Sequence, residues 1–513
     1  NYNVVLGDEA GTALTTGDSN VAIGFEALAS EDTAGRNTAV GYRSLKTNNG
    51  GDNNTAVGEN SGTAVTTGHN NTLIGQDAGE ALTDADYNVA LGSDALDADT
   101  LGSRSTAIGW SAVGHGAGEN VTTGINNTLI GGLAGDALTD ADYNVSVGSL
   151  SLTGDTLGSK STAIGYATLQ TQNFTTATDT FNTAIGAYAG VQVTTGTLNT
   201  LVGGLTGDAL TTGEENVAMG YQALGTATKS DANVAIGNSA LEALNHTTQT
   251  NSFNTAVGYA AGAAVTTGVQ NTFVGGLAGE NATTPDSSVF IGFNAGGDGV
   301  VTGNQNVLIG QDAGKNITSA NTSVMIGHNN GDAMVNGGAN TSVGSGNAFS
   351  STGVDTEFIY GRNATGGGAS TMTIGNGDTD ATLAIDGSDT SWAAASDLRL
   401  KKNIVTSTAG LSFIKELRPI QYEWKNKGEV DSSITRYHEA DSTEPCRGVG
   451  GTFHGFVAQE VKTAIDNHAS QFSDKHNIWR ERVDGIQSVS PGNLVPMLVK
   501  AIQELEARIA TLE

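Results

Sequence analysis

The sequence predicts a mainly β protein: a parallel β-solenoid or β-roll rod of 17-residue repeats, followed by a small α+β domain that ends in a coiled-coil helix. Three observations support this fold class. A short motif ending in glycine recurs at a fixed spacing over residues 1–344, the chain has 72 Gly but only 5 Pro, and the last helix carries an apolar seam. A fixed short period indicates a solenoid, because each repeat adds one coil.

The repeat has the motif Asn-(Thr/Val)-(Ala/Leu)-(Ile/Val)-Gly, whose residues we number positions 1 to 5. Most copies follow one another at 17 residues. The steps before Gly131, Gly186 and Gly258 are four or five residues longer, and the step before Gly310 is longer by one. We expect these extra residues to bulge from one corner of the solenoid. The twenty closing glycines are Gly7, Gly24, Gly41, Gly58, Gly75, Gly92, Gly109, Gly131, Gly148, Gly165, Gly186, Gly203, Gly220, Gly237, Gly258, Gly275, Gly292, Gly310, Gly327 and Gly344.

Each copy is predicted to form two short strands joined by tight turns. The first strand is the motif itself, and the second ends in Thr-Thr-Gly in several copies, as at 66–68 and 194–196. Gly and Asn at the corners suit turns that need positive φ. A helix is disfavoured, because each of the frequent glycines costs about 1 kcal/mol in a helix interior. At ~4.8 Å per strand, twenty copies predict a rod about 95 Å long.

Positions 2, 3 and 4 of the strand are all apolar or Thr, as in Thr-Leu-Ile at 72–74. A strand with one exposed face alternates apolar and polar residues, whereas a continuous apolar run indicates a sheet covered on both faces. One face can fill the interior of the coil, and the other needs a neighbour. The pattern therefore predicts an obligate oligomer of identical chains.

Residues 345–395 are expected to leave the 17-residue register of the repeats. Strand-like runs continue at 358–360, 372–375 and 383–387, and an extended end is expected at 392–395. We predict a β neck that caps the rod, or a β tip that contacts a binding partner.

The charge of the chain is divided unevenly. The formal net charge is −30, and residues 1–395 carry 8 Lys+Arg against 37 Asp+Glu, whereas residues 396–513 carry 15 against 16. Nucleic acid is therefore disfavoured as a partner, because phosphate binding needs clustered Lys and Arg. No stretch approaches the roughly 18 apolar residues that span a bilayer, so we predict no membrane insertion.

The sequence predicts neither a cofactor nor a metal site. The eight histidines show no His-Glu-x-x-His spacing, and the single Cys446 offers neither a zinc–cysteine cluster nor an intrachain disulfide. Asp-Ala-Asp-Tyr at 84–87 and 140–143 offers carboxylates for calcium. These segments lack the Gly-Gly-x-Gly-x-Asp pattern of calcium β-rolls, which favours solvated turns.

From residue 396 on, the composition is typical of a globular domain. Ser-Asp-Leu-Arg-Leu-Lys-Lys-Asn-Ile occupies 396–404, Leu-Arg-Pro-Ile-Gln-Tyr-Glu-Trp occupies 417–424, and Gly-Phe-Val-Ala-Gln-Glu-Val occupies 455–461. In order and spacing, these blocks and the final helix resemble the endosialidase-type intramolecular chaperone, an autoprocessing domain at the C-termini of phage tail fibres and tailspikes. The resemblance covers essentially all of 396–513, which we call the tail domain, and the polar loop at 428–451 departs from it.

The resemblance implies that the chain cuts itself between Ala395 and Ser396. By their places in the family motif, Ser396 is the nucleophile and Lys401 the base. A serine hydroxyl becomes nucleophilic when a neutral lysine accepts its proton, and burial or a neighbouring positive charge favours neutral lysine. Lys402 either supplies that charge or is solvated. Without the resemblance, Ser396 is read as a helix N-cap.

His454 and Gln459 are further candidates for stabilising the oxyanion or positioning the reacting groups. The alternative for His454 is a purely structural polar residue. Both belong to the part of the tail domain that carries the resemblance.

The last helix, about 494–513, has apolar residues in alternating steps of three and four, which indicates a coiled-coil seam. Branched residues alternating with Leu favour dimers by the rules for peptides, whereas the resemblance implies a homotrimer, which we expect. The seam consists of Val495, Leu498, Ile502, Leu505, Ile509 and Leu512.

The resemblance implies a phage tail fibre or tailspike precursor that binds a glycan or protein receptor on the host surface. It is expected in the virion tail after assembly in the host cytoplasm. Identical repeats pair out of register at little local cost, so a trimerising tail would set the register and then cleave itself off. One alternative is a bacterial surface adhesin, because the repeats loosely resemble the β-roll heads of trimeric autotransporter adhesins. Another is a tailspike glycan hydrolase, which needs a carboxylate pair in a groove.

Overall fold

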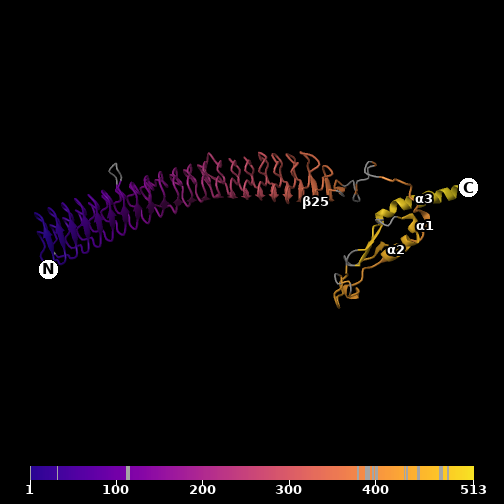
Figure 1. Cartoon of the computed structure of the whole chain (residues 1–513), viewed down its shortest axis with the longest axis horizontal. Coiled ribbons are helices and arrows are strands. Elements are labelled where there is room, and N and C mark those ends of the chain that lie inside the picture. The colour runs from indigo at the N-terminus through magenta and orange to yellow at the C-terminus, as the bar shows by residue number, and fades with distance from the viewer. Residues whose placement is uncertain are drawn as a thin grey trace. The chain divides into compact units, whose positions relative to one another are not determined.

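In the computed structural model the chain divides into two compact units, Asn1–Ala395 and Ser396–Glu513. The first unit is a stack of similar turns that carry their strands on one side, and the second is a small α+β unit (Figure 1). The predicted parallel β-solenoid and the small C-terminal domain with a terminal helix are confirmed. The structure describes residues 2–31, 33–110, 116–377, 380–386, 393–394, 398, 402–432, 434, 437–446, 451–472, 478–481 and 485–512.

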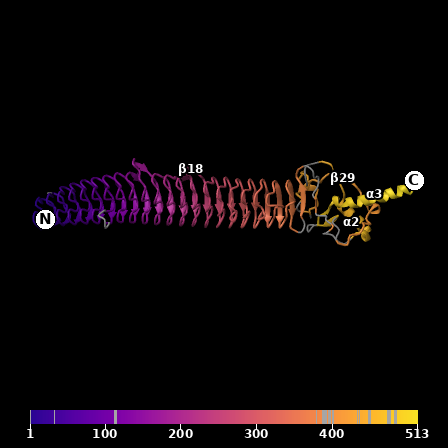
Figure 2. The same cartoon turned by 90° about the horizontal axis from the view of Figure 1, so that it is seen from above.

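A single sheet of 24 strands runs through the first unit, and 22 of these strands form a parallel ladder. Equivalent positions of successive turns lie side by side, so Thr55 pairs with both Thr38 and Thr72. Figure 2 shows the regular stacking of the turns. The strands of the ladder are β1 (Val4–Leu6), β2 (Val21–Ile23), β3 (Thr38–Val40), β4 (Thr55–Val57), β5 (Thr72–Ile74), β6 (Val89–Leu91), β7 (Thr106–Ile108), β8 (Thr128–Ile130), β9 (Val145–Val147), β11 (Thr162–Ile164), β13 (Thr183–Ile185), β14 (Thr200–Val202), β15 (Val217–Met219), β17 (Val234–Ile236), β19 (Thr255–Val257), β20 (Thr272–Val274), β21 (Val289–Ile291), β22 (Val307–Ile309), β23 (Val324–Ile326), β24 (Thr341–Ser345), β25 (Glu357–Arg362) and β26 (Thr371–Gly375).

The parallel ladder continues past the last repeat. Gly344 of β24 pairs with Gly361 of β25, and Gly361 pairs with Gly375 of β26. The strand pairing becomes antiparallel only at β27 (Ala381–Ala384) and β28 (Ala393–Ala394). The repeat register was expected to end at residue 344, but the parallel ladder continues for two further turns. The motif is lost there because Glu357 replaces the asparagine of position 1, although the strand pattern persists.

Positions 1 and 3 of the motif form the interior of the solenoid. The side chains at position 3, such as Ala56, are fully buried from the second repeat on, whereas Val5 of the first repeat is 46% exposed. The asparagine at position 1 is buried as well, and Nδ2 of Asn54 donates to the carbonyl of Gly68 at 2.8 Å. The backbone N–H of Asn54 donates to Oδ1 of Asn37 at 2.8 Å. Asn54 therefore closes its own turn and bonds to the neighbouring turn, which satisfies its buried amide, and most asparagines at position 1 do the same.

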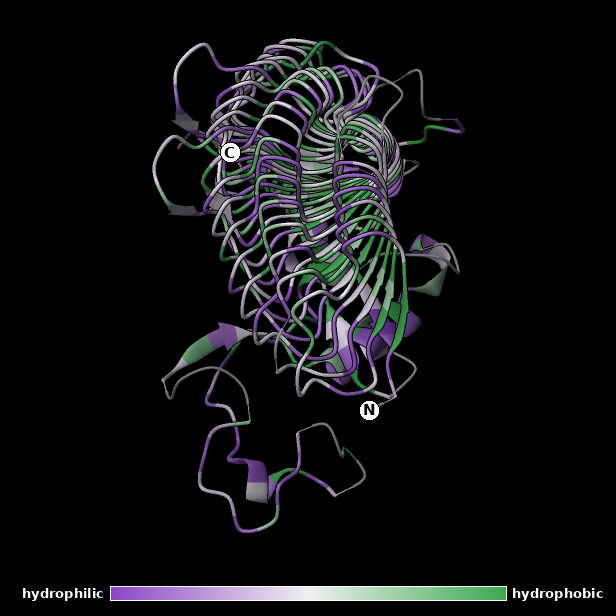
Figure 3. Cartoon of the chain, turned by 90° about the vertical axis from the view of Figure 1, so that its left-hand side faces the viewer, coloured by the Kyte–Doolittle hydropathy of each residue, from purple (hydrophilic) through white to green (hydrophobic). Residues whose placement is uncertain are grey.

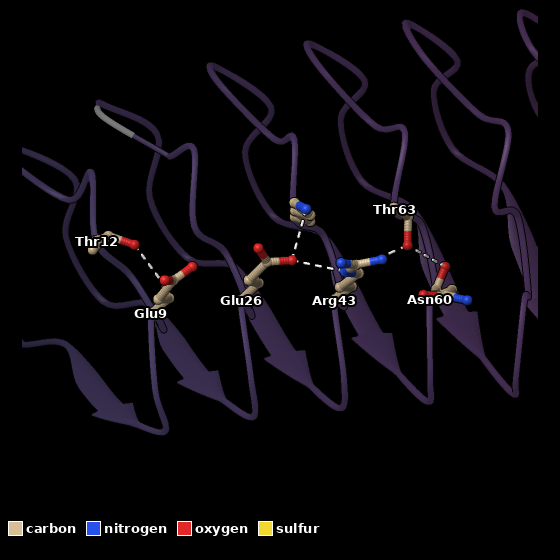
Figure 4. Close-up of polar contacts among 7 residues, drawn as sticks. Glu9, Thr12, Glu26, Arg43, Asn60 and Thr63 are labelled. Carbon is tan, nitrogen blue, oxygen red and sulfur yellow. Dashed lines mark hydrogen bonds and ion pairs between the residues drawn. The ribbon is translucent and has the colours of Figure 1, made fainter.

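After the closing glycines from Gly7 to Gly327, the second and fourth residues have left-handed backbone wherever the structure describes them. Arg43 has a φ of 54° and Leu45 a φ of 47°. This conformation costs a leucine about 1–2 kcal/mol, and burial of the Leu45 side chain, worth about 1.5–3 kcal/mol, offsets that cost. Figure 4 shows the row of second residues, in which Nε of Arg43 lies 2.7 Å from Oε2 of Glu26 in the preceding turn.

The predicted second strand is wrong for most repeats. The Thr-Thr-Gly segments at 66–68 and 194–196 form bends, although Thr66 N–H still donates to the carbonyl of Thr83 at 3.0 Å. A compact turn of alternating backbone handedness occupies the residues that a second strand would need. In the described part of the solenoid, extra two-residue strands pair beside the second and third insertions, as β10 (Gly158–Ser159) with β12 (Thr178–Asp179) and β16 (Ser230–Asp231) with β18 (Thr250–Asn251).

The second unit packs three helices against two small antiparallel sheets. Its core contains Phe413, Val461, Ile465, Ile478 and Leu494. The strands are β29 (Ile420–Tyr422), which pairs with β30 (Phe453–Gly455), and β31 (Trp479–Glu481), which pairs with β32 (Gln487–Val489). The helices are α1 (Leu411–Ile414), α2 (Ala458–Asn467) and α3 (Val495–Ala510), with 3-10 turns η2 (Lys427–Glu429), η3 (Ala469–Gln471) and η4 (Pro491–Leu494).

Candidate functional site

The predicted cleavage residues Ala395, Ser396 and Lys401 lie outside the residues that the structure describes. Their roles stay predictions. The neighbouring Lys402 is exposed, which matches the solvated alternative for this residue in a single chain. Ile404 is 60% exposed and Val405 84% exposed, so the segment that follows the predicted site leaves apolar side chains uncovered.

His454 and Gln459 lie on two consecutive elements of the tail domain. His454 is the middle residue of β30, and its backbone pairs with Gln421 of β29. Gln459 is the second residue of α2, and its backbone carbonyl accepts a hydrogen bond from Oγ1 of Thr463 at 3.0 Å. Both side chains are exposed and face solvent rather than the core. Their proposed roles in the cleavage also stay predictions.

Ion pairs join α2 and the residue after it to the segment that follows α1. Nε of Arg418 lies 2.9 Å from Oε2 of Glu460, and Nε2 of His468 lies 2.9 Å from Oε1 of Glu416. The hydrogen bond from Arg418 lowers the pKa of the exposed Glu460 carboxyl. These surface contacts orient elements more than they stabilise them, because exposed ion pairs contribute about 0–1 kcal/mol.

The seam of α3 is exposed along its whole length. Its exposed fraction is 54% at Val495, 43% at Leu498, 64% at Ile502, 44% at Leu505 and 57% at Ile509. Contiguous apolar side chains in water indicate an interaction site. Among the described residues none covers this seam, which makes it a candidate interaction surface of the tail domain.

A contact with α1 holds α3, the helix that carries this seam, in place. The carboxylate of Glu504 accepts a hydrogen bond at 2.8 Å from the backbone N–H of Leu411, the first residue of α1. An apolar cavity of about 270 Å³ lies beside the seam, with Leu417, Phe456 and Leu498 among its lining residues. Leu498 belongs to both features, so the seam and the cavity form one continuous apolar surface.

A second cavity, of about 450 Å³, lies next to the β29–β30 sheet. Tyr422, Trp424, Phe456 and Cys446 are among the residues that line it. The rings of Tyr422 and Trp424 meet edge to face, with centroids 5.2 Å apart. Part of its lining, including Tyr422 and Trp424, comes from the block 417–424 on which the family resemblance rests.

Carboxylates gather on one row of the solenoid, where Asp77, Glu80, Asp94 and Asp97 come from successive turns. Partial burial, followed by repulsion from Glu80 and Asp94, raises the pKa of Asp97 to about 6. Among the described residues, no group of three or more His, Cys, Asp or Glu side chains is placed to hold a metal ion. Within the same residues, every helix is too short or too polar to cross a membrane.

The comparisons with known proteins agree with this class of molecule, a β-solenoid followed by a C-terminal assembly domain. Residues 396–470 match the model of a peptidase family described as the chaperone of endosialidase. The match supports an intramolecular chaperone with autoproteolytic activity at the end of the solenoid. No curated protein and no solved structure matches the chain.

Sequence reasoning found the seam but missed the contacts that support it. Glu504 carries no motif, and only its bond to Leu411, 93 residues earlier, shows that it caps α1. The cavity beside Leu498 was also unforeseen, because its lining comes from segments far apart in the chain. An acidic residue that caps a helix from a distant segment can be recognised only when the tertiary structure is known.

Proposed function

We propose that this chain is a phage tail fibre or tailspike subunit whose tail domain trimerises and registers the rods and then cleaves itself off. The observation that carries the proposal is the match of residues 396–470 to the chaperone of endosialidase, directly after a solenoid of 22 parallel strands. The exposed seam of α3 and the cavity beside it supply the self-association surface. The rod, left behind, contacts a receptor on the host surface.

Cleavage would proceed in two steps at the Ala395–Ser396 bond. Oγ of Ser396 attacks the carbonyl carbon of Ala395 while Nζ of Lys401 accepts the hydroxyl proton. The peptide C–N bond breaks, the Ser396 nitrogen leaves as an amine after gaining a proton, and an ester joins Ala395 to Oγ of Ser396. Water then hydrolyses this ester to the Ala395 carboxylate and the free Ser396 hydroxyl. His454 and Gln459 are the candidate groups for stabilising the oxyanion.

Mutation of the proposed dyad tests the cleavage. Ser396→Ala and Lys401→Ala should each give one full-length band on a denaturing gel, whereas the wild-type chain should give fragments 1–395 and 396–513. Lys402→Ala is the matched control, because it removes a neighbouring exposed ammonium and should leave cleavage intact. Complete cleavage of both dyad variants, with the tail still beginning at residue 396, would exclude Ser396 and Lys401 as the reacting pair.

A further inference from the structure

We propose that the outer face of the solenoid sheet is the contact between parallel copies of this chain, aligned turn for turn around a common axis. The inference rests on the proposed function, and it adds which surface of the rod is used and what fixes its register. We define two edge positions of each repeat: position 0 precedes the asparagine of position 1, and position 6 follows the closing glycine of position 5.

The outer sheet face carries apolar side chains and Thr and is uncharged over its whole length. Positions 2 and 4 point out of the coil, and their side chains are half-buried to exposed, as at Leu91 (42%) and Met219 (45%). In all twenty repeats these positions hold only Val, Thr, Ile, Leu or Met, whereas residues 1–395 contain 37 Asp and Glu. Figure 3 shows the strands as an apolar band along one side of the rod. An acidic chain that keeps one face free of charge over its whole length indicates that this face is covered.

The size and spacing of the face identify the occupant as a second copy of the chain. Twenty turns at ~4.8 Å and a strand width of roughly 10 Å give about 1,000 Å² per chain, which exceeds the ~800 Å² per partner of a standard stable interface. Ridges of side chains repeat along the face at the spacing of the strands. A partner that follows them over this length needs the same period, which another copy of the solenoid has.

In part of the repeats the two edges of the face are complementary in size. Of the twelve repeats with a large apolar or aromatic side chain at one edge, six carry a small residue at the other. Tyr143 and Leu198 at position 0 are 54% and 49% exposed, and they share their repeats with Ser149 and Gly204 at position 6. The pairs of this kind are Tyr87 with Ser93, Tyr143 with Ser149, Phe181 with Ala187, Leu198 with Gly204, Ser19 with Phe25, and Ser287 with Phe293.

Basic residues at position 0 also coincide with rings at position 6, although two of them already lie over rings of their own chain, Arg104 over Tyr87 at 5.9 Å and Lys160 over Phe181 at 5.2 Å. Position 0 carries a Lys or Arg in three repeats, and each of these repeats has an aromatic ring at position 6. A cation over an aromatic face is a favourable contact. Tyr2 and Tyr221 share their repeats with an acidic residue, and one repeat has rings at both edges, Phe253 and Tyr259. The cation–aromatic pairs are Arg36 with Tyr42, Arg104 with Trp110, and Lys160 with Tyr166.

This matching cannot act within one chain. Positions 0 and 6 are separated by six residues across an extended strand, which is roughly 20 Å. When parallel copies surround an axis that runs along the rod, position 6 of one copy lies beside position 0 of the next at the same turn. A slip of one turn would set Leu198 against Tyr221 instead of Gly204. The edges therefore distinguish the correct register from a slipped one.

Disulfide trapping tests the contact in self-processed rods that carry Cys446→Ser. Chains with Leu198→Cys and chains with Gly204→Cys are co-expressed and oxidised. The structure accepts both changes, because Leu198 is exposed and a Cβ on Gly204 would meet its nearest neighbour at 3.8 Å. We expect a cross-linked pair of chains on a non-reducing gel. A second matched pair, Tyr143→Cys with Ser149→Cys, should link as well.

The control combines Leu198→Cys with Ser149→Cys, whose turns lie three apart, or roughly 14 Å along the rod. These sulfurs should stay unlinked, because a disulfide needs Cα atoms within about 7 Å. Rods that sediment as oligomers but give no link for the matched pairs, or equal links for the control, would overturn the inference and leave the proposed function standing. Rods that are cleaved yet sediment as monomers would overturn the inference together with the trimerisation that the proposed function assigns to the tail domain.

Discussion

At the scale of single residues, the seventh residue after the closing glycine is apolar in most repeats, but where it is Glu31, Asn48, Asp99 or Asp155 it accepts a hydrogen bond from the backbone N–H three residues later. Asn48 uses both amide atoms: Oδ1 accepts from Gly51 N–H at 3.1 Å, and Nδ2 donates to its carbonyl at 2.9 Å. Asp99 occupies the same place, and Oδ1 accepts from Gly102 N–H at 2.7 Å. The other oxygen, Oδ2, is buried without a hydrogen-bond partner. Burial raises the pKa of Asp99 to about 8.

Asp99 should therefore make the rod less stable as the pH rises. The folded-state pKa of about 8 lies above the ordinary value of 3.8, so the folded chain binds the proton more tightly than the unfolded chain. Stability from this group is fully present below about pH 4 and is lost as the pH rises to about 8. Asp99→Asn should raise the melting temperature at pH 8 and leave it almost unchanged at pH 4, because asparagine can make the bonds of Asn48.

Circular dichroism melts of the rod at pH 4, 6 and 8 measure this difference between wild type and variant. Asn48→Asp is the reciprocal control, and it should introduce the pH dependence that Asp99→Asn removes. Equal melting differences at every pH would show that Asp99 is not a buried neutral acid.

At the scale of an element, neighbouring residues of one strand have different tasks. Ala56 at position 3 is fully buried in the coil, whereas Val57 at position 4 lies on the outer face and is 36% exposed. Ala56→Asp should unfold the rod locally, because a buried charge without a partner costs several kcal/mol. Val57→Asp should preserve the fold of each chain and prevent the chains from associating.

Circular dichroism together with sedimentation separates these two outcomes. The Ala56→Asp rod should lose β signal or melt at a clearly lower temperature, and the Val57→Asp rod should keep its β signal and sediment as a smaller species. An oligomer of unchanged size and stability for Val57→Asp would show that the outer face is not an interface.

The terminal helix permits an analogous test in the uncleaved Ser396→Ala chain. Ile502 is the most exposed seam residue within the body of α3, at 64%, so a charge there is tolerated by a single chain. Ile502→Glu should weaken association at least tenfold, because each seam residue meets its counterparts in the other helices. Glu506→Gln, on the exposed surface of the same helix, is the control and should leave the sedimentation unchanged.

The sequence predicted the elements whose signal is local and repeated. The Asn-to-Gly motif gave the parallel strand and its buried middle residue, and the block 396–404 gave the tail domain. The second strand was predicted wrongly for most repeats, because a turn of alternating handedness, as at Arg43 and Leu45, cannot be recognised from residue composition. The ladder beyond residue 344 was missed because Glu357 hides the motif. Contacts across long separations, such as Glu504 with Leu411, needed the structure.

At the scale of the whole molecule, we propose that both the tail domain and the edges of the repeats set the register in which the chains associate. Identical strands pair in any register at nearly the same local cost, so a solenoid of this length is prone to slipped association. The edge positions favour one register, but they act only after long stretches have met. Under the proposed function, the seam of α3 would bring chains together at one end and so select the register early. Cleavage would then leave the rod without the means to reassemble, and its stability would be kinetic.

The most direct test of this account compares rods made with and without the tail domain. Residues 1–395 are expressed alone, and their sedimentation and melting are measured beside the self-processed product of the full chain. The account predicts aggregates or mixed sizes from the truncated gene and a single oligomer from the full one. Soluble rods of the same size and stability from residues 1–395 alone would contradict it, because the tail domain would then not be a chaperone.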